Sequence, residues 1–207
     1  MMKVLGRENS INVRKVLWAC DELGLSYEHE AWGLEDRPLA SEEFQKLNPN
    51  GKIPVLIDGE TTLSESNTII RYLANREGNH DLYPAEPARR AAVDMWMDWQ
   101  AAELNPAWRY AFHGLVRNNP NNRDEMRIQE SLDQWTKHMD MLETRLAGTA
   151  AYVAGNAFTL ADIPIGLAVN RWFMTPGTSY RHPATAEYYE RLSERPAFLR
   201  HGRNGVA

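Results

Sequence analysis

Residues 48–59 read Asn-Pro-Asn-Gly-Lys-Ile-Pro-Val-Leu-Ile-Asp-Gly, and this stretch decides the fold. Asn-Pro-Asn-Gly is typical of a turn, because Asn and Gly tolerate a positive φ and proline fixes its own φ. The aliphatic residues 55–57 predict a buried strand, and the following Asp-Gly predicts a hairpin turn into a returning strand at residues 61–63. Pro54 cannot donate a hydrogen bond to a neighbouring strand, so the backbone of Ile53 is free to pair with another peptide.

A helix is predicted to begin directly after this hairpin, at Glu65 and Ser66. The first N–H groups of a helix have no partner within it, and the helix dipole adds partial positive charge there, so a helix start attracts a carboxylate. Lys52 supplies a further positive charge. An extended backbone, a lysine and an anion-binding helix start together would suit a short acidic peptide.

The composition indicates a soluble, cytosolic protein with a hydrophobic core. The chain has 207 residues, 43% of them hydrophobic, and a formal net charge of −5, which argues against nucleic acid as a partner. Cys20 is the only cysteine, so no intrachain disulfide is possible and a reducing compartment fits. The first residues do not read as a signal peptide, and no apolar run approaches the ~18 residues of a membrane span.

The first part of the chain predicts the element order β-α-β-α-β-β-α. Apolar residues repeat at helical spacing between residues 13 and 20, after a suitable cap at Asn9 or Ser10. The strands on either side of this helix should be parallel, because a helix joins them. The expected elements are a strand at 3–6, a helix that stops near Gly24, a strand at 25–32, a short helix from Ser41, the hairpin at 48–63 and a helix at 66–76.

The second part of the chain predicts helices alone. We expect a domain at residues 1–77, a linker at 78–87 and an all-helical domain at 88–207. Pro87 suits the first position of a helix. The expected helices are one at 88–117 with a kink at Pro106, one along 128–146 that ends at Gly148, one that starts at a capping box at 159–162, and two short ones near Pro183 and Pro196.

These features together resemble the cytosolic glutathione S-transferase family, in its theta- and delta-like bacterial form with serine in the active-site loop. The resemblance is carried by the Asn-Pro-x-Gly-Lys-Ile-Pro-Val-Leu run, the Glu-Ser-x-x-Ile helix start, the capping box and the all-helical second half, and it covers nearly the whole chain. It implies an α/β thioredoxin-like N-terminal domain followed by an all-α C-terminal domain. It also implies a transferase that conjugates the thiolate of glutathione to small hydrophobic electrophiles.

The resemblance further implies a glutathione-binding site. Pro54 would be cis, and the backbone of Ile53 would pair with the cysteinyl unit. Ser66 would bind the γ-glutamyl carboxylate, Glu65 would face the amine, and Lys52 would meet the glycyl carboxylate. The complete implied set is Asn9, Asn50, Lys52, Ile53, Pro54, Glu65 and Ser66.

Ser10 is the candidate that activates the thiol. The thiolate is the nucleophile, and a free thiol with a pKa of about 8.5 is only slightly ionised at neutral pH. A hydroxyl group that donates to sulfur favours the charged form. Ser10 opens the first helix and lies four residues before Arg14, as the catalytic serine does in the resembled members. Asn12 is the second choice, and Asn9 can also donate; tyrosine and cysteine are missing from this loop.

The second substrate would be an electrophile with an apolar body. Trp32, Trp108, Tyr110 and Phe112 are the candidate pocket residues, and Trp172 is a further one. The family is mostly homodimeric, so Asp98 or Glu103 would reach the partner's glutathione amine. We expect no metal, since His113 and His138 lack metal-ligand spacing.

Two other functions remain open from the sequence. One is a glutathione-dependent peroxidase or reductase on the same fold, which would differ in its activity with organic hydroperoxides. The other is a noncatalytic interaction module, which the intact glutathione motifs disfavour.

Overall fold

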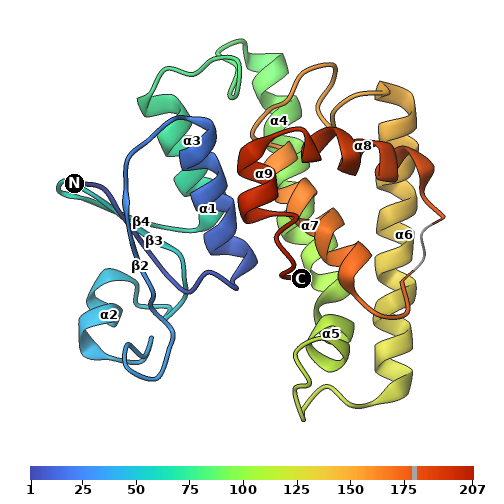
Figure 1. Ribbon diagram of the computed structural model, residues 1–207, viewed down its shortest axis with the longest axis horizontal. Helices are drawn as coiled ribbons and strands as arrows, with labels where there is room; N and C mark the ends of the chain where they lie inside the picture. Colours follow the sequence, from blue (N-terminus) through green and yellow to red (C-terminus); the bar gives the residue numbers. More distant parts are fainter. Residues whose placement is uncertain (179–180) are drawn as a thin grey trace.

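The computed structural model describes residues 1–178 and 181–207 and begins with a four-stranded sheet (Figure 1). Its strands are β1 (Lys3–Leu5), β2 (Glu28–Glu30), β3 (Val55–Asp58) and β4 (Thr61–Ser64), in the order β2-β1-β3-β4. β1 and β2 are parallel, as predicted, and β3 pairs antiparallel with both β1 and β4. The predicted strand at 25–32 is shorter than expected, because only residues 28–30 pair with β1.

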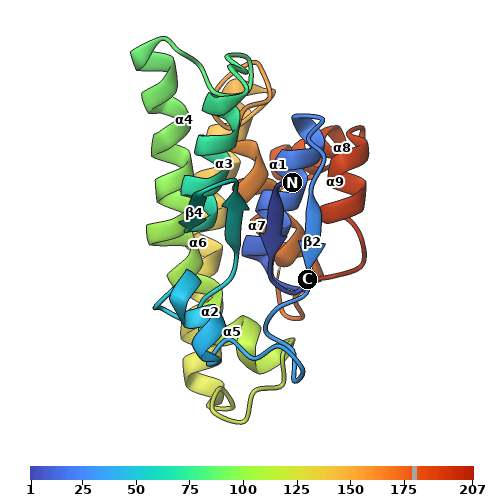
Figure 2. The same cartoon turned by 90° about the vertical axis from the view of Figure 1, so that its left-hand side faces the viewer.

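Helices cover both faces of this sheet. They are α1 (Ile11–Glu22), α2 (Glu42–Leu47) and α3 (Ser66–Arg76). Successive strand residues point to opposite faces. Val4 and Leu56 therefore belong to the main core with α1 and α3, whereas Leu5 and Val55 belong to a smaller core with Phe44 of α2. Figure 2 shows the molecule from the side of α2, with the sheet in front of α1.

The rest of the described chain is helical, which confirms the expected fold class. It contains α4 (Pro87–Trp99), the π-helical segment η1 (Gln100–Leu104), α5 (Asn105–Leu115), α6 (Glu125–Thr149), α7 (Asp162–Met174), α8 (Pro183–Ser193) and α9 (Pro196–His201). Where the sequence predicts a kink, the structure has the π-helical segment η1, which ends just before Pro106. This proline lies in the first turn of α5. The predicted end at Gly148 is wrong, because α6 continues to Thr149 and ends at Ala150, which has a φ of +49°.

A buried carboxylate fixes the start of α7. Asp162 accepts hydrogen bonds from the backbone N–H groups of Thr159 (2.8 Å) and Val153 (2.9 Å) and from the hydroxyl of Tyr188 (3.0 Å). These donors offset the cost of burying a polar group. The predicted helix start is confirmed, but only half of the predicted capping box is present: Asp162 accepts from the N–H of Thr159, whereas the hydroxyl of Thr159 donates to the same carboxylate (3.2 Å) and does not cap the helix.

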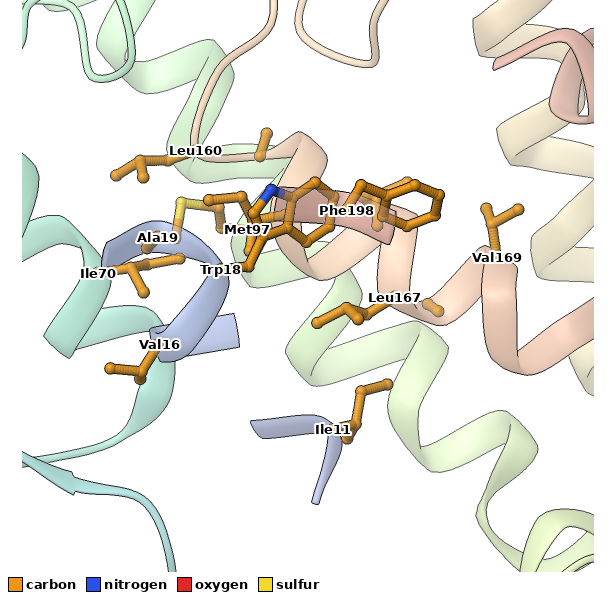
Figure 3. Packing of buried hydrophobic residues seen from close by; sticks show 14 of the residues in the cluster. Ile11, Val16, Trp18, Ala19, Ile70, Met97, Leu160, Leu167, Val169 and Phe198 are labelled. Atoms are coloured by element: carbon orange, nitrogen blue, oxygen red, sulfur yellow. The ribbon is translucent and has the colours of Figure 1, made fainter. Parts of the chain in front are cut away.

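The two halves of the molecule share the helix α1. Its Trp18 is fully buried and packs on Phe198 of α9, with ring centroids 4.9 Å apart. Figure 3 shows these two rings with Met97 and Ile70 in one continuous core. Because α7 and α9 cover the side of α1 that faces away from the sheet, polar residues of α1 are buried as well.

The connection between the two halves runs from the end of α3 at Arg76 to the start of α4 at Pro87. The domain limits 1–77 and 88–207 stay a prediction. Within the described residues, no helix combines the length and the apolar character that a bilayer crossing requires.

Candidate active site

Ser10 stands at the N-terminal end of α1 with its hydroxyl group unused. Its backbone is extended (φ −84°, ψ 121°), and its carbonyl accepts the first helical hydrogen bond, from the N–H of Arg14 (3.0 Å). The side chain does not cap the helix and has no hydrogen-bond partner among residues 1–178 and 181–207. The hydroxyl is therefore available to a bound group, at a position where the dipole of α1 favours negative charge.

The start of α3 lies against the first turn of α1. Ser66, 7% exposed, donates from its hydroxyl to Oδ1 of Asn12 at 3.4 Å, although the two residues are 54 positions apart. Glu65 precedes Ser66 with a φ of +67°, and its side chain is exposed. Such a backbone conformation costs a residue other than glycine roughly 1–3 kcal/mol and clusters at functional sites. The structure thus brings together three of the candidates that the sequence places in two separate segments.

Asn48 holds the turn that precedes Pro54. Its side-chain amide donates to the carbonyl of Lys52 (2.7 Å), and its Oδ1 accepts from the N–H of Asn50 (3.1 Å). The Ile53–Pro54 peptide bond is cis, as predicted. In the described part of the chain, the backbone N–H and C=O of Ile53 take part in neither a strand ladder nor another hydrogen bond. This peptide edge is open to a partner.

A buried lysine lies beneath the start of α3. Lys15 is 1% exposed, and its Nζ donates to Oε1 of Gln100 in η1 (3.0 Å) and to Oδ1 of Asn67 in α3 (3.3 Å). Burial, followed by the positive charge of Arg171, lowers the pKa of Lys15 to about 7, while Glu65 acts in the opposite direction. A neutral amine still has two N–H groups for these two acceptors. Lys15 therefore ties α1, α3 and η1 together with or without its extra proton.

We expect Lys15 to make the protein more stable as the pH rises from 7 to 9. A lysine in the unfolded chain has a pKa of about 10.4. Between pH 7 and 9 the unfolded state therefore binds more protons than the folded state, and the free energy of unfolding increases with pH. This increase should be about 2 kcal/mol larger in the wild type than in Lys15→Met, as measured by urea unfolding.

The control for this prediction is Lys46→Met, because Lys46 is an exposed residue of α2 that pairs with Glu42 at the surface. Its stability should change with pH as the wild type does. If the wild type and Lys15→Met give parallel curves, Lys15 keeps its proton in the folded state up to pH 9 and the prediction is wrong.

Two of the four aromatic candidates meet on α5. Trp108 and Phe112 pack edge-to-face with ring centroids 5.4 Å apart and are 6% and 2% exposed. The guanidinium of Arg171 lies over both rings, 4.4 Å and 3.8 Å from their centroids. Tyr110 points elsewhere, since the guanidinium of Arg127 in α6 lies 4.2 Å from its ring centroid.

The remaining aromatic candidates lie away from this pair. Trp32 packs on Phe44 with ring centroids 5.2 Å apart, donates its indole N–H to Glu30 (3.2 Å), and lines a cavity beside α2. Trp172 is fully buried in the helical half, 5.0 Å from Trp135 by ring centroids. Trp32 therefore belongs to the smaller core beside α2, and Trp172 to the main core.

Asp98 and Glu103, the two residues expected to reach the glutathione amine of a partner subunit, differ in their surroundings. Asp98 accepts a hydrogen bond from Arg71 of the same chain (2.7 Å), and Glu103 is exposed. In the described part of the chain, no three or more His, Cys, Asp or Glu side chains form a group that could hold a metal ion.

Sequence reasoning missed several residues of this site. Lys15, Gln100 and Arg171 were not candidates, because their meeting depends on how the helical half packs on α1. The sequence gives no local signal for this burial, because Arg14 and Lys15 both lie away from the apolar stripe of residues 13, 16, 17 and 20, on the side of a helix that is ordinarily exposed.

Comparisons with known proteins agree along both halves of the chain. The family model described as "Glutathione S-transferase, N-terminal domain" matches residues 5–81, and "Glutathione S-transferase, C-terminal domain" matches residues 101–196. Glutathione S-transferase GstB of Escherichia coli strain K12 is 38% identical over 199 residues, which are 95% of this chain and 95% of that protein. Glutathione S-transferase 3 of Zea mays is 32% identical over 204 residues, 95% of this chain and 91% of that protein.

Solved structures of glutathione S-transferases are also similar to this chain over its whole length. The theta class glutathione S-transferase from Xanthomonas axonopodis pv. citri, with glutathione bound, is 36% identical and superposes with a TM-score of 0.89 over 100% of this chain and 99% of that chain. Glutathione transferase F7 from Populus trichocarpa is 26% identical, with a TM-score of 0.89 and complete coverage of both chains.

Proposed function

Because this chain belongs to the glutathione S-transferase family, we propose that it conjugates the thiolate of glutathione to small hydrophobic electrophiles. The observation that carries the proposal is the unused hydroxyl of Ser10 at the start of α1. Glutathione as the substrate is supported by the bound glutathione in the similar theta class structure. The chain is a glutathione S-transferase, and we propose in addition that it works in the cytoplasm as a homodimer and needs no metal.

Glutathione would lie along the peptide edge of Ile53. The unpaired N–H and C=O of Ile53 would bind the cysteinyl unit in the manner of a strand. At the γ-glutamyl end, Ser66 would bind the carboxylate with its hydroxyl and backbone N–H, and Glu65 would attract the amine. Lys52, whose carbonyl Asn48 fixes, would meet the glycyl carboxylate. Asn50 and Asn9 border this path.

This binding would place the glutathione sulfur near Ser10. The hydroxyl of Ser10 would donate to the sulfur, and the N-terminal end of α1 adds favourable partial charge. Both stabilise the thiolate over the thiol. Asn12 accepts from Ser66 through its Oδ1, and Asn9 accepts from Arg117 through its carbonyl (2.8 Å), so these bonds leave the side-chain N–H groups of both as donors. We prefer Ser10 because it is the N-cap residue of α1 and its side chain makes no capping hydrogen bond.

We expect Ser66→Ala to weaken glutathione binding about tenfold. A hydrogen bond to a charged group contributes roughly 1.5–3 kcal/mol, and about 1.4 kcal/mol corresponds to a tenfold change in the dissociation constant. Isothermal titration calorimetry measures it. Ser64→Ala, two residues earlier in β4, should bind glutathione like the wild type. Unaltered affinity in Ser66→Ala would remove Ser66 from the γ-glutamyl site.

The electrophile would bind beside Trp108 and Phe112, which share a face of α5. Activity with chlorodinitrobenzene tests the conjugating function directly. Activity with cumene hydroperoxide and none with chlorodinitrobenzene would favour the peroxidase alternative. Failure of the protein to bind immobilised glutathione would instead favour the noncatalytic interaction module.

A further inference from the structure

A chain of polar side chains runs through the interior from the first turn of α3 to the indole of Trp108. Nζ of Lys15 donates to Oδ1 of Asn67 (3.3 Å) and to Oε1 of Gln100 (3.0 Å). Nε2 of Gln100 donates to Oδ1 of Asn105 (2.8 Å), and the indole N–H of Trp108 donates to the same oxygen atom (3.1 Å). We call these five residues the polar chain. It joins α3, α1 and η1 to the aromatic pair of α5.

The π-helical segment η1 brings Gln100 and Asn105 together. The N–H of Asn105 donates to the carbonyl of Gln100, five residues earlier. In an α-helix the side chains three or four residues apart face each other, whereas the i→i+5 bond of a π-helix brings residues five apart to the same side. Trp108 follows Asn105 by three residues, so it continues the same face within α5. A regular α-helix would turn Gln100 away from this row.

The donors and acceptors of the polar chain run in one direction. The ammonium group of Lys15 only donates, so the oxygen of Gln100 faces it and the NH2 group of Gln100 faces Asn105. An indole nitrogen also only donates, so Asn105 turns its oxygen towards Trp108. Gln100 is fully buried and Trp108 is 6% exposed. Because a buried donor without an acceptor is costly, a change of donor or acceptor at either amide should disturb the indole.

The indole of Trp108 is one wall of the proposed electrophile site. Its ring packs edge-to-face on Phe112, and the guanidinium of Arg171 lies over it, 4.4 Å from the centroid. These contacts hold the plane of the ring. The hydrogen bond to Asn105 decides which edge of the indole faces the helix and which edge faces away from it. A flat ligand that packs beside this ring therefore depends on the hydrogen bond as well.

We propose that Gln100 and Asn105 are positioning residues, which hold the indole of Trp108 in the orientation that the aromatic part of the electrophile requires. This inference rests on the proposed conjugating function. The two amides act through Trp108 and not on the reacting atoms. The proposed glutathione contacts of Ile53 and Ser66 are separate from the polar chain. Changes at the two amides should therefore affect the binding of the aromatic group and leave the tripeptide unaffected.

The test compares S-(4-nitrobenzyl)glutathione with S-methylglutathione, since both are thioethers and they differ in the aromatic group. Gln100→Glu keeps an oxygen for Lys15 but offers no N–H to Asn105, and Asn105→Leu removes the acceptor of the indole. Each variant should bind S-(4-nitrobenzyl)glutathione about tenfold more weakly than the wild type, because the buried indole N–H loses its fixed partner. The affinity for S-methylglutathione should stay the same. Isothermal titration calorimetry measures both.

Two further variants serve as controls. Asn105→Asp still accepts from both neighbours, so it should keep the wild-type affinity for S-(4-nitrobenzyl)glutathione. Gln129 is an exposed residue of α6 that donates to Asp133 (2.8 Å), so Gln129→Glu should change neither affinity. Wild-type affinity for S-(4-nitrobenzyl)glutathione in Gln100→Glu or Asn105→Leu would overturn the proposal. An equal loss of affinity for S-methylglutathione would also overturn it, because the amides would then support the tripeptide site.

A double-mutant cycle shows whether Gln100 acts through the indole. Trp108→Phe keeps an aromatic ring without the N–H group, so the addition of Gln100→Glu should weaken S-(4-nitrobenzyl)glutathione binding no further. Additive losses would contradict the proposal. These measurements require no turnover. The expected affinities in a protein that conjugates no electrophile would support the polar chain and contradict the transferase function, whereas conjugation of chlorodinitrobenzene together with additive losses would do the reverse.

Discussion

Replacement of Ser10 by alanine should lower kcat/KM for glutathione conjugation about 100-fold at pH 6.5. Removing a preorganised donor from a developing or full negative charge costs on the order of 10²–10³ in rate. The pKa of the bound thiol should rise by roughly one to two units, since each unit corresponds to about 1.4 kcal/mol of lost thiolate stabilisation. The pH profile of thiolate absorbance in the binary complex measures this rise.

The thermal stability of Ser10→Ala and of a second variant, Ser41→Ala, separates this catalytic role from a role in capping the helix. Because the Ser10 side chain does not cap α1, Ser10→Ala should unfold at the same temperature as the wild type. In contrast, Ser41→Ala should be destabilised, since Oγ of Ser41 accepts from the N–H of Phe44 (3.3 Å) and caps α2. An unchanged pH profile in Ser10→Ala, together with a shifted profile in Asn12→Ala, would transfer the role to Asn12.

The second large effect is expected from Gly6→Ala. Gly6 follows β1 with a φ of +141°, and a Cβ atom there would lie 2.5 Å from Cγ2 of Val13 and 2.9 Å from Cβ of Ile53. Overpacking costs roughly 1–3 kcal/mol and the strained backbone a similar amount. We therefore expect the free energy of unfolding to fall by about 3 kcal/mol or more, and glutathione affinity to fall as Ile53 is displaced.

Gly24→Ala is the matched control. Gly24 also has a positive φ, +64°, but a Cβ atom there would have no neighbour within 4 Å. It should lose only about 1 kcal/mol and bind glutathione normally. If Gly6→Ala matches Gly24→Ala in both stability and affinity, the close approach of Gly6 to Ile53 has no role in shaping the peptide edge.

The local features of the site are predictable because short segments encode them. The turn before Pro54, the hairpin and the start of α3 depend on Asn, Gly and Pro at fixed spacing, and the structure has all three where they were expected. The helix start at Asp162 is encoded in the same way. The similar family structures confirm the fold class that these segments indicate.

The features that depend on packing between distant segments were not predictable. Trp108 and Tyr110 are two residues apart, so they point to different sides of α5, and only the position of α6 decides which side is covered. Lys15 is buried because η1 and α7 cover α1 from the helical half. The spacing of residues in the sequence predicts neither of these contacts.

The most direct test of the account is a crystal structure of the protein with glutathione bound. We expect the cysteinyl unit to pair with the backbone of Ile53, and its sulfur to lie within hydrogen-bonding distance of Oγ of Ser10. A sulfur atom that contacts Asn12 but not Ser10, or a glutathione molecule that leaves the Ile53 backbone unpaired, would contradict it.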